Sequence, residues 1–220
     1  MLGRSVQEIL MSIPGILIAM VISGFAQAYI ADKLGDTTPR YQGKLSLNPK
    51  EHIDPFGFLI FVLVGFGWSK PVDINPRNFK NIRVDTALVS AAGFAANILM
   101  AVLFAIIIKI LILANVFVIL GDNVGGNLLK ILNYCIRYNL IFFVLGILPI
   151  PPFPGSRILE SLTNIERYEI YANLKRYSLF VFLILYATNI LSIIITYPCY
   201  YIYLFILRIF GLRIFGLPLM

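Results

Sequence analysis

The chain has 220 residues, of which 59% are hydrophobic and only 13% are charged, and its mean hydropathy is +0.86. This composition excludes an ordinary soluble domain, because a soluble domain needs a polar exterior. The net charge of +7 comes from basic residues spread over the loops between apolar runs, which argues against nucleic-acid binding. We therefore expect a multi-pass protein of the cell membrane, in contact with the lipid bilayer.

Four apolar segments are long enough to cross a hydrocarbon core, which needs roughly 20 helical residues. They are residues 9–31, 86–120, 131–150 and 178–197. A fifth run, 199–210, is short and could return across the bilayer only together with 212–219. The run 56–68 is too short to cross and contains three glycines, so we predict a re-entrant or interfacial segment. Residues 1–220 are predicted to form one all-α membrane domain, with the C-terminal spans in 178–220.

Lys and Arg placement predicts how these spans are oriented, because cytoplasmic loops carry an excess of basic residues. Basic residues are frequent in 33–83 and 157–176 and occur again near the C-terminus, whereas the connector 121–129 has none. We therefore predict that the N-terminus and the connector 121–129 lie outside. The two long polar stretches and the C-terminus are predicted to be cytoplasmic.

The spans lack the residues that hydrolysis inside a membrane would use. A zinc hydrolase typically has two His one helical turn apart with a Glu beside the first, but this chain has a single His, His52. No Asp or Glu lies within the four spans, which excludes an aspartyl dyad there. The serines of the spans have no histidine as a base, and Lys109 is most simply a snorkelling residue. Cys135 and Cys199 are predicted to be buried free thiols.

Several motifs nevertheless carry a family signature. The segments ADKLGDTT, GKLSLNPKEHIDPFG and GFGWSKPVDINPRNFK lie between the first and second spans, and AGFAAN and LPIPPFPGSRIL follow. Together they resemble the site-2 protease family of intramembrane zinc metallopeptidases, and most nearly its short bacterial branch. The resemblance covers about residues 18–162. It implies a site-2 protease-like transmembrane core, zinc as the cofactor and a transmembrane protein segment as the substrate.

The family's functional positions fall on residues that cannot perform the family's chemistry. Its H-E-x-x-H helix falls on 23–27, so Ser23 and Gln27 replace the two zinc-binding His and Gly24 replaces the Glu base. Pro154 replaces the Asp that is the third ligand. Gly146 replaces an Asn of the N-x-x-P-x-P-P pattern, and Phe94 replaces the Pro of G-P-x-x-N. None of these replacements is a good zinc ligand, so we expect no bound metal.

The remaining motifs predict a scaffold. The Pro-rich tract 149–155 cannot form a regular helix. The segment 43–49 alternates in polarity like a short strand, and the resemblance implies a membrane-edge β-hairpin there that could pair with an unwound substrate. Asn97 is near the active centre in the family and could equally be an interhelical hydrogen-bond residue. His52 is predicted to hydrogen-bond the turn at Asp54. The predicted partner-binding residues are Asn97, Lys44, Leu45, Ser46 and Leu47.

We therefore expect a pseudoprotease, which binds a transmembrane segment or a partner membrane protein without cleaving it. One alternative is an active intramembrane metalloendopeptidase with unconventional zinc ligands. A weaker alternative is a small transporter, which would need polar residues along several spans, whereas the spans here have few.

Overall fold

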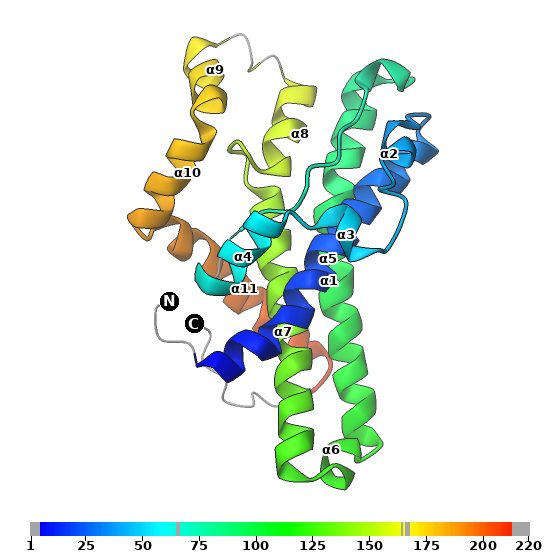
Figure 1. Cartoon of the computed structure of the whole chain (residues 1–220), viewed down its shortest axis with the longest axis vertical. Helices are drawn as coiled ribbons and strands as arrows, with labels where there is room; N and C mark the ends of the chain where they lie inside the picture. Colours follow the sequence, from blue (N-terminus) through cyan, green and yellow to red (C-terminus); the bar gives the residue numbers. More distant parts are fainter. Residues whose placement is uncertain (1–4, 65–66, 164, 166–167, 213–220) are drawn as a thin grey trace.

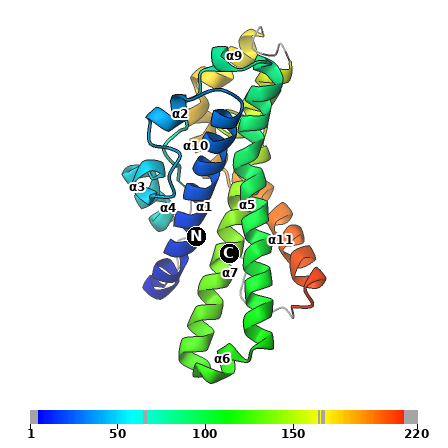
Figure 2. The ribbon, with the colours of Figure 1, turned by 90° about the vertical axis from the view of Figure 1, so that its right-hand side faces the viewer.

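The computed structural model describes residues 5–64, 67–163, 165 and 168–212 of the chain. Three long helices pack side by side: α1 (Val6–Lys33), α5 (Ile82–Leu113) and α7 (Gly121–Ile147) (Figure 1). A fourth, α11 (Ile190–Ile209), packs against α7, on the opposite side of this core from α4 (Pro55–Val64) (Figure 2). These four long helices are long and apolar enough to cross a membrane. The prediction of an all-helical protein with several apolar helices long enough to cross a membrane is thus confirmed.

Local sequence sets the ends of α1. Its first turn is a capping box, in which the Ser5 hydroxyl accepts from the Glu8 N–H and the Glu8 carboxylate accepts from the Ser5 N–H. After Lys33 the chain turns at Gly35, whose φ of +107° lies in the region that glycine tolerates. The turn places the buried Asp36 directly beyond the helix.

Asp36 attaches the end of α1 to the connector that leads into α5. Its carboxylate accepts hydrogen bonds from the Thr38 N–H and hydroxyl at 3.1 and 2.6 Å, from the Asn75 N–H at 2.7 Å and from the Asn78 amide at 2.8 Å. Burial by itself raises the pKa of Asp36, but these hydrogen bonds outweigh it and lower the pKa below its usual value. The clamp fixes the path of a connector that also forms one wall of the site.

The connector between α1 and α5 is built from short helices and turns: α2 (Thr38–Tyr41), α3 (Pro49–His52), α4 and the 3₁₀ helix η1 (Pro76–Asn78). No β-strand occurs among the described residues, so the predicted hairpin at 43–49 is wrong. Gly43 turns the chain with a φ of +73°, and Asn48 caps α3 immediately afterwards. The buried Lys44 donates to the Glu51 carbonyl at 2.6 Å, so the alternating segment is folded on itself instead of extended. The predicted interfacial run at 56–68 contains α4, a ten-residue helix that is too short to cross a bilayer.

The C-terminal part differs from its predicted spans. After α7 the chain forms α8 (Pro154–Leu162), α9 (Glu169–Arg176), α10 (Ser178–Ala187) and α11. The predicted span 178–197 is broken after α10, where Asn189 adopts a left-handed φ of 59°. Residues 199–209 lie within α11. The predicted return crossing also needs 212–219, and residues 213–219 lie outside the described part of the chain, so it stays a prediction. Within the bundle, the Tyr203 hydroxyl of α11 donates to the Asn133 side chain of α7 at 2.8 Å.

The connection between α5 and α7 is shorter than predicted. It contains only the one-turn helix α6 (Val116–Ile119), and residues 121–129 form the first turns of α7. Four crossing helices return the described end of the chain to the end of the bundle where α1 begins, and Gly211 lies close to Lys109 near the end of α5. Both termini lie outside the described residues, so the predicted external N-terminus and cytoplasmic C-terminus stay predictions. Which face of the bundle is cytoplasmic stays a prediction.

Single-cysteine labelling in intact cells tests that prediction. In a background with Cys135 and Cys199 replaced by serine, a cysteine at Asn123 should react with an impermeant maleimide added outside. Cysteines at Asn78 and Asn173, which are exposed at the opposite end of the bundle, should react only after the membrane is permeabilised. The reverse pattern would invert the orientation.

Candidate functional site

The six altered family positions line one cavity. Its volume is about 550 Å³, and its walls come from α1, the connector at 67–72, α5, the end of α7, the start of α8, and α10. The altered positions that line it are Ser23, Gly24, Gln27, Phe94, Gly146 and Pro154. Residues far apart in the sequence thus meet where the resemblance places a catalytic centre. The cavity is the candidate functional site.

Ser23 and Gln27 lie one turn apart on α1 and pack against α5. The Gln27 amide is 3.5 Å from the Ser23 hydroxyl, a long hydrogen bond. A Cβ on Gly93 of α5 would lie 2.6 Å from the Gln27 amide nitrogen and 2.8 Å from the Ser23 hydroxyl oxygen. A side chain at position 93 would therefore displace the Gln27 amide and the Ser23 hydroxyl.

Gly24 lies against the ring of His52. A Cβ on Gly24 would be 2.4 Å from the His52 Nδ1 atom, so the ring fills the space beside α1 at this position. His52 is fully buried, and its Nε2 atom donates to the Ser46 carbonyl at 2.6 Å, which assigns the proton to Nε2. The predicted bond to the turn at Asp54 is wrong, since the Asp54 carboxylate instead accepts from the Gly57 N–H.

The neutral form of this ring is favoured. Burial lowers the pKa of His52, and repulsion from Lys44 and Lys70 lowers it further, against the Ser46 hydrogen bond. Among the described residues, the Nδ1 atom has no hydrogen-bond partner. The atom that faces position 24 is therefore a buried acceptor without a donor.

Gly146 and Phe94 form the contact between α7 and α5 at the cavity. A Cβ on Gly146 would lie 2.4 Å from the Phe94 Cβ atom, and the Phe94 ring packs edge-on against Phe143. The two departures from the family pattern thus touch each other, since the large residue at 94 occupies the space that a side chain at 146 would need. Pro154 is the first residue of α8 and follows the buried Phe153.

The other predicted site residues lie away from the cavity lining. Asn97 is fully buried in α5, and among the described residues neither atom of its amide has a hydrogen-bond partner, so no interhelical bond is seen. Lys44 and Ser46 are engaged within the connector, and Leu47 is exposed. Contact of Asn97 or of the segment from Lys44 to Leu47 with a partner stays a prediction.

Comparison with known proteins agrees with this geometry. The chain is 33% identical over 186 residues to a protein of Bacillus subtilis named "Putative zinc metalloprotease YwhC", covering 83% of this chain and 84% of that protein. The chain belongs to the site-2 protease family. It is also 28% identical over 185 residues to "Putative zinc metalloprotease Rip2" of Mycolicibacterium smegmatis, covering 82% of this chain and 68% of that protein. No protein-family model matches the chain, and no solved structure matches it significantly.

The residues present do not fit the zinc of a site-2 protease. The positions of the base and the three ligands carry a hydroxyl, a glycine, a neutral amide and a proline, and none offers the imidazole, thiolate or carboxylate that zinc prefers. In the part of the chain that the structure describes, no three His, Cys, Asp or Glu side chains come together as a metal-binding group. His52 offers one nitrogen and no companion ligand.

Sequence reasoning missed three features of this site. It placed His52 in a loop, although the ring lies against Gly24, and it treated the changes at 94 and 146 as independent. It also did not single out Lys70 or Arg157, which line the cavity. The joint departure of positions 94 and 146 from the family pattern was a signal that the two residues touch.

A substitution at Gly146 tests the contact with Phe94. Gly146→Ala should lower stability by about 1–3 kcal/mol, because its Cβ would overlap the Phe94 Cβ atom. Gly126→Ala, in the same helix with nothing within 4 Å of the added Cβ, is the matched control. It should be neutral or stabilising by about 0.5–1 kcal/mol. Thermal unfolding in detergent measures both.

The double variant Phe94→Gly/Gly146→Ala removes the overlapping atom. We expect its loss of stability to be smaller than the sum of the two single losses. Additive losses, or equal effects of Gly146→Ala and Gly126→Ala, would show that the contact at this crossing does not limit the approach of α5 and α7.

Proposed function

We propose that this chain is a pseudoprotease of the site-2 protease family, which holds a transmembrane segment without cleaving it. One observation carries the proposal: the positions of the family's zinc ligands and base all line a single cavity of about 550 Å³, and none of the residues there is a good zinc ligand. A cavity of this size fits several side chains of a bound segment. One of its lining residues, Trp68, is 40% exposed.

The walls of the cavity support binding of an apolar segment. Phe94, Phe142 and Phe182 contribute aromatic surface from three different helices. Ser23 and Gln27 offer hydrogen-bonding groups to a backbone that is locally unwound, a state that membrane helices adopt only where protein or water satisfies the freed groups. A family of enzymes that cleave membrane segments needs such a cavity for binding as well as for catalysis, so binding can persist after catalysis is lost.

The alternatives have weaker support. A metalloprotease with unconventional ligands has only one imidazole near the cavity and no carboxylate among the residues that line it. A transporter would need a polar path across the bundle, whereas most buried side chains between α5, α7 and α11 are aliphatic or aromatic, with Asn97, Asn133 and Asn139 as the polar exceptions.

Photocrosslinking tests the binding role. A benzophenone side chain at Trp68, a partly exposed residue that lines the cavity, should form adducts with polypeptides. Mass spectrometry should find the membrane segments of these polypeptides intact. The same side chain at Leu99, which is 69% exposed on α5, is the lipid-facing control and should form lipid adducts. If the captured polypeptides have been cut within their membrane segments, the proposed loss of cleavage is contradicted. If position 68 gives no more polypeptide adducts than position 99, the cavity does not hold a segment.

Restoring the family's residues tests how far the site has diverged. In the quadruple variant Ser23→His, Gly24→Glu, Gln27→His and Pro154→Asp, both imidazoles return to one face of α1. The new Glu, however, meets the His52 ring, and Gly146 still lacks a side chain beside Phe94. The Pro154 change also restores an N–H and frees φ at the first residue of α8.

We expect this variant to gain some zinc affinity but little or no cleavage of a labelled single-span peptide, because loss of supporting contacts typically reduces metal-site activity about 10–100-fold. Elemental analysis and gel analysis of the peptide are the two measurements. Rapid, chelator-sensitive cleavage by the quadruple variant would show that only the ligands had been lost.

A further inference from the structure

The cavity carries positive charge without a matching negative charge. Its charged lining residues are Lys70 and Arg157, and it has no acidic lining residue. The Lys70 ammonium donates to the Lys50 carbonyl at 2.9 Å, which is a neutral acceptor. Arg157 is half-buried, and within the described chain no ion pair involves it. A half-buried cation without a counter-charge favours an anionic occupant.

The nearest acidic residue on the same helix does not neutralise Arg157. Glu160 lies three residues further along α8, a spacing that permits an ion pair. Both of its oxygens are engaged elsewhere: one accepts from the Tyr171 hydroxyl at 2.9 Å and the other from the Lys175 ammonium at 2.9 Å. The α8–α9 contact thus holds this carboxylate and leaves the guanidinium of Arg157 available.

The start of α8 adds a further positive contribution. Phe153 and Pro154 at this helix terminus line the cavity, and the N-cap residue Phe153 provides no side-chain hydrogen bond to the first turn. The N-terminus of a helix carries a partial positive charge from its unpaired N–H groups. Two cationic side chains and a helix N-terminus therefore face one cavity.

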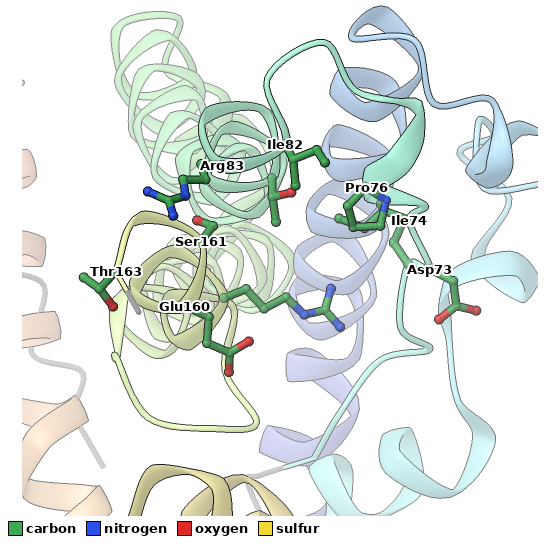
Figure 3. Close-up of a pocket in the computed structure, with 11 residues that line it drawn as sticks. Asp73, Ile74, Pro76, Ile82, Arg83, Glu160, Ser161 and Thr163 are labelled. Carbon is green, nitrogen blue, oxygen red and sulfur yellow. The ribbon is translucent and has the colours of Figure 1, made fainter. Parts of the chain in front are cut away.

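Arg157 also lines a second cavity, of about 540 Å³, at the polar end of the bundle. Figure 3 shows this cavity between the connector residues Asp73, Ile74 and Pro76 on one side and Arg83, Glu160 and Ser161 on the other. Val72 and Arg157 are common to the two cavities. The guanidinium thus belongs to the boundary between an aromatic cavity within the bundle and a polar cavity at its end.

We infer that the occupant is a transmembrane segment with an acidic residue where it leaves the bilayer, and that Arg157 pairs with this carboxylate. The apolar part of the segment fits the aromatic cavity, and the polar residues after the carboxylate fit the second one. That second cavity has both acidic and basic lining residues, which suits the mixed donors and acceptors of a peptide better than an anionic lipid headgroup. This inference rests on the proposed function.

Two synthetic peptides test it with the full-length protein in phosphatidylcholine nanodiscs. Each has an apolar span of roughly 20 residues, followed by Glu in one peptide and Gln in the other, then the same polar tail. We expect the Glu peptide to bind wild-type protein about tenfold more tightly than the Gln peptide, the effect of one charge-assisted contact. In Arg157→Gln the two peptides should bind equally. Arg208→Gln, an equal loss of charge at the exposed end of α11, should preserve the difference.

The outcomes separate this inference from the proposed function. Equal binding of both peptides to wild-type protein, without cleavage, overturns the role of Arg157 and leaves the binding role intact. Cleavage of either peptide, or binding of neither, contradicts the proposed function itself. Phosphatidylglycerol in the nanodisc should leave the preference for Glu unchanged. If it displaces the Glu peptide from wild-type protein and not from Arg157→Gln, the site binds a lipid headgroup and the inference fails. Should Arg157→Gln fail to fold, the comparison of the two peptides on wild-type protein decides.

Discussion

The close approach of α1, α5 and α7 is the constraint on which the rest of the structure depends. A Cβ on Gly15 of α1 would lie 2.8 Å from the Tyr134 carbonyl oxygen of α7, and Gly93 and Gly146 allow equally short contacts where α5 meets α1 and α7. In a bilayer, helices associate through close packing of small residues, because lipid is as apolar as the helix surfaces. These glycine contacts help to set the distances between the three helices, and with them the space in the aromatic cavity that all three line.

The chemistry of the cavity is consistent with the loss of a metal. A buried carboxylate or imidazole without zinc would be an unpaired polar group, and a charged one at membrane depth costs roughly 2.5–3.5 kcal/mol. Glycine, proline and neutral side chains avoid this penalty. His52 is an exception, because its buried Nδ1 atom faces Gly24 and has no hydrogen-bond donor among the residues that the structure describes. Phe94 and Gly146, which both depart from the family pattern, contact each other where α5 meets α7.

Much of this arrangement follows from sequence patterns that act locally. Apolar length predicted α1, α5 and α7, and the motif positions Ser23, Gln27 and Pro154 do meet in one cavity. The break before α11 could not be predicted from hydropathy, because apolar residues lie on both sides of Asn189 and only its left-handed φ ends α10. Alternation at 43–49 suggested a strand. The segment is not extended, because the buried Lys44 donates to the Glu51 carbonyl and Asn48 caps α3.

The features that sequence could not supply are contacts between distant segments. Glu160 is three residues from Arg157, a spacing on one helix that predicts an ion pair between them. The Glu160 carboxylate instead accepts hydrogen bonds from two side chains of α9. The position of the His52 ring against Gly24 likewise depends on how the connector folds, which the Asp36 clamp and the Ser46 hydrogen bond determine together. The uncompensated charge of Arg157 within the described chain and the position of the His52 ring therefore follow from contacts between distant segments, and a local sequence pattern does not predict them.

Metal content of the purified protein decides between a binding protein and an enzyme. After equilibration with zinc and removal of free metal, elemental analysis of wild-type protein should find no zinc above the level of a buffer blank. The reason is that no residue at the ligand positions of the cavity is a good zinc ligand. About one zinc per chain, removed by a chelator together with cleavage of a membrane segment, would contradict the proposal and identify a metalloprotease with unconventional ligands.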